Sequence, residues 1–121
     1  MKRIFLIIIL TTFCLKTLGQ STDRLYTIKD NNLYSYIDKT GKTIIKPQFL
    51  SAGEFSEGLA PVRLNGTYGY INTKGKFIIS PKFDLGLSLY NGLAKVFIDG
   101  KPFFINKKGS IFFNYNYKKI S

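Results

Sequence analysis

The chain has 121 residues, which is enough for one small domain and too few for two. Hydrophobic residues make up 45% and charged residues 21%, so a disordered chain and a protein with several membrane spans are both excluded. There is no His and a single Cys, which excludes His-based catalysis and metal sites built from these ligands. Lys and Arg number 18 against 7 Asp and Glu, and the formal charge of +11 indicates an anionic partner or surface.

Residues 1–19 have the layout of a signal peptide. Met1-Lys2-Arg3 is a short basic segment, an apolar run too short to span a bilayer follows it, and Thr17-Leu18-Gly19 offers small residues for cleavage. We therefore expect a mature chain that begins at Gln20 and has no transmembrane span. The protein is expected to be exported by a bacterium and to be periplasmic, cell-surface or secreted. Its formal charge is then +8, because three basic residues and no acid are removed.

Two other outcomes remain open for this segment. Cys14 would be the lipidated residue of a lipoprotein, although Phe13 stands immediately before it, where a small residue is required. Alternatively, the segment stays in place as an N-terminal anchor. If it is cleaved, no cysteine remains, so no disulfide can stabilise the mature domain.

A repeat of 34 residues occupies the rest of the chain. Residues 33–66 align with residues 67–100 without a gap, and 14 of the 34 positions are identical. Within the middle copy, residues 59–64, 67–72 and 76–80 alternate like short strands and are separated by turn residues. Each unit is therefore predicted to be a three-stranded antiparallel meander.

Two kinds of turn join these predicted strands. The first is a two-residue turn, Asn31-Asn32, Asn65-Gly66 or Asp99-Gly100, for which we expect positive φ at both central positions. The second has three residues and ends in Gly41, Gly75 or Gly109. A terminal Gly suits a type I turn followed by a bulge whose glycine is left-handed.

The predicted fold is all-β, with three tandem meanders at about residues 25–46, 59–80 and 93–117 within a single domain, residues 20–121. One meander is only marginally stable, but stacked units bury a shared core. Three units are too few for a closed propeller, so we expect an open stacked or propeller-like arc. Two connectors, residues 47–58 and residues 81–92, join the units, and in the first we expect one helical turn near residues 51–55. The aromatic strand at residues 111–117 is expected to cap the end or to offer an edge for pairing.

The repeat resembles the WG repeat family of bacterial β-rich tandem repeats. Tyr68-Gly69-Tyr70-Ile71-Asn72 matches the Trp-Gly-Tyr-Ile-Asp core of that family, with Tyr in place of Trp. Residues 34–38 have Tyr at the Trp position and Ser at the Gly position, and residues 102–106 have Pro and Phe at these two positions. Residues 52–62 match the second half of the family pattern, which ends in Gly-Leu-Ala-x-Val. The resemblance implies a binding or scaffolding module with no catalytic residues and no cofactor.

Lysines gather around the three-residue turn of every unit. Stacked units would align them as a basic rim that could bind a polyanion or a glycan, although lysines in turns also serve solubility and block edge pairing. An anionic polysaccharide, a lipopolysaccharide or lipid headgroups fit an exported protein better than nucleic acid does. The lysines of the candidate surface are Lys39, Lys42, Lys74, Lys76, Lys107 and Lys108.

Four tyrosines complete the candidate surface. Tyr34 and Tyr36 alternate along one predicted strand, and so do Tyr68 and Tyr70, so each pair shares one face. These rings could stack on sugars, or they could form the core between units with their hydroxyls reaching water.

Acidic and amide groups give weaker signals. Asp38, Asn72 and Asn106 recur before the second turn, where their oxygens could bind a hard cation or, as we expect, accept backbone N–H groups of the turn. Glu54 and Glu57 lie close together in the sequence, but nothing indicates the opposed geometry of a glycosidase. We therefore expect no enzyme activity and no metal site. The hypothesis is an exported repeat module that binds a protein or an envelope component.

Overall fold

The computed structural model describes residues 24–114, and its secondary structure there is entirely β. The predictions for the signal peptide and for Cys14 concern residues outside this range. The strands are β1 (Tyr26–Asp30), β2 (Leu33–Ile37), β3 (Thr43–Phe49), β4 (Ser51–Ala52), β5 (Ala60–Leu64), β6 (Thr67–Ile71), β7 (Phe77–Phe83), β8 (Leu85–Gly86), β9 (Leu93–Ile98), β10 (Lys101–Asn106) and β11 (Ile111–Asn114).

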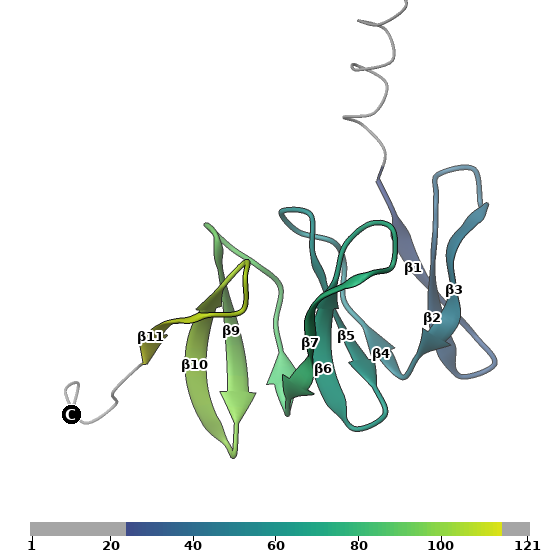
Figure 1. Cartoon of the computed structure of the whole chain (residues 1–121). Coiled ribbons are helices and arrows are strands. Elements are labelled where there is room, and N and C mark those ends of the chain that lie inside the picture. The colour runs from purple at the N-terminus through teal and green to yellow at the C-terminus, as the bar shows by residue number, and fades with distance from the viewer. Residues whose placement is uncertain (1–23, 115–121) are drawn as a thin grey trace, which may run out of the picture.

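These strands form three antiparallel sheets that follow the repeat. Sheet 1 has the order β1-β2-β3, sheet 2 the order β4-β5-β6-β7, and sheet 3 the order β8-β9-β10-β11. Figure 1 shows the three sheets in an open row, with sheet 1 and sheet 3 at opposite ends. The prediction of three tandem meanders in an open stack is therefore confirmed.

The connectors differ from the prediction. The third strand of the middle unit was expected to end at Ser80, but β7 continues to Phe83, and β8 then pairs with β9 of the next sheet. The expected helical turn at residues 51–55 is wrong, because Ser51 and Ala52 form β4 and pair with β5. The physical reason is that the free edge of β5 supplies partners for backbone N–H and C=O groups in the connector.

The two-residue turns agree with the prediction except in the middle unit. Both residues have positive φ in Asn31-Asn32 and in Asp99-Gly100. In the middle turn the positive φ, 61°, lies at Asn65 and not at Gly66.

Two hydrophobic layers hold the row together. Tyr36, Ile45 and Phe49 of sheet 1 pack with Ala60, Val62 and Ile71 of sheet 2. One repeat further along, Tyr70, Ile79 and Phe83 of sheet 2 pack with Ala94, Val96 and Ile105 of sheet 3. Sheet 2 is therefore covered on both faces, and each layer joins one face of a unit to the opposite face of the next.

The glycine-ended loops stack in the same order. A Cβ placed on Gly75 would lie 3.2 Å from Ile45 Cγ2, and one placed on Gly109 would lie 3.1 Å from Ile79 Cγ2. The second and third of these loops thus each lie against a core isoleucine of the preceding unit. Figure 1 shows the loops after β2, β6 and β10 along one edge of the molecule, the upper edge in that view.

Candidate functional site

The candidate site is the edge formed by three loops, residues 38–42, 72–76 and 106–110, which we call the basic edge. The same internal hydrogen bonds shape each loop. The Asp38 Oδ1 atom accepts the N–H of Thr40 at 2.9 Å and that of Lys42 at 3.0 Å. In the other loops Asn72 and Asn106 accept two backbone N–H groups each, at 2.9–3.1 Å. The predicted turn role of these three side chains is confirmed.

Asp38 keeps a negative charge on this edge. The Thr40 hydroxyl, 2.6 Å from Asp38 Oδ1, and the backbone N–H groups of the loop lower the pKa of this carboxyl below its ordinary value. Because the carboxylate is engaged within its own loop, it shapes the loop and offsets one of the surrounding positive charges.

The six candidate lysines all lie on the basic edge, and all are exposed: Lys39, Lys42, Lys74, Lys76, Lys107 and Lys108. Asp30, Asp84 and Asp99 lie toward the opposite edge, where the two-residue turns are; there the Asp84 carboxylate accepts the N–H of Asp99 at 2.8 Å. The structure therefore concentrates positive charge along one side of the row.

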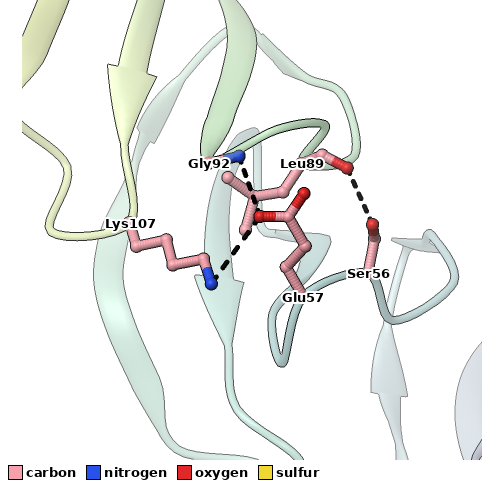
Figure 2. Close-up of polar contacts among 5 residues, drawn as sticks. All are labelled: Ser56, Glu57, Leu89, Gly92 and Lys107. Atoms are coloured by element: carbon pink, nitrogen blue, oxygen red, sulfur yellow. Dashed lines mark hydrogen bonds and ion pairs between the residues drawn. The ribbon is translucent and has the colours of Figure 1, made fainter.

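Lys107 has an acidic partner within residues 24–114. Its Nζ atom lies 3.6 Å from Glu57 Oε1, and the same oxygen accepts the Gly92 N–H at 2.8 Å (Figure 2). Nearby, the Ser56 hydroxyl donates to the Leu89 carbonyl at 2.7 Å. Glu57 thus links the first connector to the second connector and to the loop of the third unit.

A pocket of about 670 Å³ lies between the first and second loops of the basic edge. Three cationic side chains line it, together with Asp38, two threonines and two aliphatic residues. The lining residues are Arg24, Leu25, Asp38, Lys39, Thr40, Ile44, Thr73 and Lys74. Arg24 also contacts Glu54 at 3.9 Å, where both side chains are largely exposed.

Sequence reasoning did not include Arg24 in the candidate surface. In an antiparallel meander the start of the first strand lies at the same end as the loop between the second and third strands. Arg24 precedes β1, so the predicted topology contained the signal that places it beside the first loop.

Two of the candidate tyrosines belong to the core. Tyr36 and Tyr70 are fully buried, and their hydroxyls donate to the carbonyls of Gly53 at 2.6 Å and Leu87 at 2.7 Å. Their assignment to a binding surface is therefore wrong, because two-residue alternation reveals a shared face but not which face is covered. Tyr34 and Tyr68 are half-buried and pack against the same two hydrophobic layers.

The comparisons with known proteins point to one family. The model of the family described as WG containing repeat matches residues 34–68 and again residues 68–101. No curated protein and no solved structure matches the chain. Within residues 24–114, no helix is long and apolar enough to cross a membrane.

Proposed function

The chain belongs to the WG containing repeat family, and from this premise we propose that it is a non-catalytic, exported repeat module that binds an anionic glycan of the cell envelope. The ligand class follows from the charge of the basic edge. An anionic polysaccharide or the sugar phosphates of a lipopolysaccharide carry regularly spaced negative groups, and these match a row of repeated loops.

The pocket between the first two loops is the observation that supports this proposal. It presents Arg24, Lys39 and Lys74 around a concave surface, with threonine hydroxyls beside them. A sulfate, phosphate or carboxylate group on a sugar would gain ion pairs from the cations, and the sugar hydroxyls would gain hydrogen bonds from Thr40 and Thr73. Leu25 and Ile44 offer apolar surface to the sugar ring.

The non-catalytic part of the proposal is supported by what the polar groups already do. The Asp38 carboxylate shapes its loop, the Glu57 carboxylate joins two connectors, and the hydroxyls of Tyr36 and Tyr70 are buried on carbonyls. Each of these groups is bound within the fold, as expected of a module whose chemistry is recognition.

The experiment is a binding titration with the wild type and two double variants of equal charge. Lys39→Gln with Lys74→Gln removes two positive charges from the pocket. Lys29→Gln with Lys101→Gln removes two charges near the opposite edge. We expect the pocket variant to bind an anionic polysaccharide about tenfold more weakly, and the control variant to bind it within about twofold of the wild type. Affinity should also fall as salt rises, because exposed charges are screened.

Equal losses in the two variants would contradict the proposal, because they would mean that only net charge matters. Binding to vesicles of anionic lipid without binding to the polysaccharide would assign the edge to a membrane surface instead. Retention unchanged in a variant in which Lys74, Lys76, Lys107 and Lys108 are all Gln would exclude the lysines of the second and third loops as the binding site.

A further inference from the structure

Two Asn-Gly pairs occur in the chain, Asn65-Gly66 and Asn91-Gly92. Each forms a two-residue hairpin turn, and both asparagines are exposed and have positive φ, 61° and 52°. An asparagine followed by glycine can react with its own main chain, because glycine has no side chain to hinder the approach of its backbone nitrogen to the asparagine side chain. The sequence therefore offers two turns at which asparagine could be converted to aspartate.

The reaction consumes water and needs no other reactant. The glycine nitrogen loses its proton and attacks the asparagine Cγ atom, so that an N–Cγ bond forms, the Cγ–Nδ2 bond breaks and ammonia leaves. Water then opens the resulting succinimide ring at either of its carbonyl carbons. The product is aspartate or isoaspartate, and each carries a negative charge that asparagine lacks.

The two turns differ at the nitrogen atom that has to react. The Gly92 N–H donates to Glu57 Oε1 at 2.8 Å, and the Lys107 Nζ atom lies 3.6 Å from the same oxygen (Figure 2). Loss of the Gly92 proton would break this charge-assisted hydrogen bond and would place a negative nitrogen beside a carboxylate. Glu57 therefore holds the Gly92 nitrogen in its unreactive, protonated form.

The Gly66 nitrogen has no such partner. Within residues 24–114 its N–H makes no hydrogen bond, and nothing lies within 4 Å of a Cβ placed on Gly66. The pairing of Leu64 with Thr67 closes the turn, while Asn65 and Gly66 themselves stay exposed to water. The nitrogen that has to react is thus open in this turn.

We propose that Asn65 is a site of spontaneous deamidation in the folded protein, and that Glu57 protects Asn91 from the same reaction. The protected turn is the one at which a new negative charge would lie beside the basic edge, because the Glu57 oxygen that accepts the Gly92 N–H also contacts Lys107. Asn65 lies between β5 and β6, at the opposite edge (Figure 1). The inference does not depend on the proposed glycan ligand.

The test is incubation of the folded wild type in mildly alkaline buffer, followed by peptide mapping with mass spectrometry that separates asparagine, aspartate and isoaspartate at each position. We expect Asn65 to deamidate at least about tenfold faster than Asn91, because a charge-assisted hydrogen bond at the reacting nitrogen has to break first at Asn91. Equal rates at the two positions would overturn the proposal. So would an Asn65 that stays intact while a linear peptide of residues 60–71 deamidates in the same buffer.

Glu57→Ala separates local protection from a general loosening of the fold. It removes the acceptor of the Gly92 N–H, so the rate at Asn91 should rise at least about fivefold while the rate at Asn65 stays within about twofold of the wild type. Lys107→Gln is the matched control, because it changes a charge in the same cluster but keeps the acceptor, and it should not raise the rate at Asn91. An unchanged rate at Asn91 in Glu57→Ala, or an equal rise at both asparagines, would contradict the role assigned to Glu57.

Discussion

Two tyrosine hydroxyls, those of Tyr36 and Tyr70, show how single residues hold the connectors in place. Tyr36 donates to Gly53 and Tyr70 donates to Leu87, in both cases to a carbonyl 17 residues further along the chain. Each ring fills the core of one interface while its hydroxyl fixes the connector that leads to the next sheet. An amphipathic ring suits this position because a buried hydroxyl needs a partner.

Alkaline pH tests this role of the tyrosines. Burial raises the pKa of Tyr70 well above its ordinary value near 10, so the folded state favours the neutral phenol. The resulting stability is complete below pH 10 and is lost as the pH rises further, by up to about 1.4 kcal/mol per pH unit. Tyr70→Phe should lower stability at neutral pH by about 1 kcal/mol, through loss of the hydrogen bond, and should flatten this alkaline slope.

Denaturant unfolding between pH 8 and pH 11 measures both effects. Tyr90→Phe is the control, because the Tyr90 side chain is 77% exposed. Identical slopes for the wild type and Tyr70→Phe would show that the Tyr70 hydroxyl is not buried as described.

At the scale of the element, the pairing of β6 with β7 explains the glycine that follows the tyrosine in the middle repeat. Tyr68 pairs with Phe83 and Tyr70 pairs with Ile79, so one residue of β6 lies opposite three residues of β7. The resulting bulge brings the backbone of β7 over Gly69. A Cβ at Gly69 would lie 2.6 Å from the Ile79 carbonyl oxygen and 2.7 Å from the Pro81 nitrogen. Sheet 1 has the same register shift between β2 and β3 and holds Ser35 at this position, so the close approach at Gly69 belongs to the middle sheet and not to the register shift alone.

Gly69→Ala should therefore destabilise the protein by about 2 kcal/mol or more, because the backbone must shift to admit one methyl group. Gly66→Ala is the matched control, since nothing lies within 4 Å of a Cβ at that position. Thermal unfolding of the two variants measures the difference. A Gly69→Ala variant as stable as the control would contradict the described bulge.

The elements that sequence analysis missed are the ones without a local pattern. A strand of two residues, such as Ser51–Ala52, cannot show alternation, and it forms only because β5 presents a free edge. Turns and longer strands were predictable because glycine, asparagine and alternating apolar residues determine the backbone conformation of their own segment. In the candidate site, the cluster of lysines could be predicted from the repeat. The ion pair of Lys107 with Glu57 could not, because the two residues are 50 positions apart and no sequence pattern relates them.

At the scale of the whole molecule, each sheet packs on the apolar face of the sheet that follows it in the chain. Sheet 1 covers sheet 2, and sheet 2 covers sheet 3, so the middle sheet has no face left open. The basic edge lies outside these stacked layers, and its lysines are exposed. Because the chain repeats one interface, the central claim is that equivalent contacts recur at a spacing of 34 residues.

The most direct measurement of this claim is the nuclear Overhauser effect between the glycines of the loops and the isoleucines of the preceding unit. The described contacts predict cross-peaks from the Gly75 Hα protons to the Ile45 methyl groups and from the Gly109 Hα protons to the Ile79 methyl groups. Gly41 has no such neighbour and should give no equivalent cross-peak. Absence of both predicted cross-peaks in a folded sample would contradict the stacked arrangement.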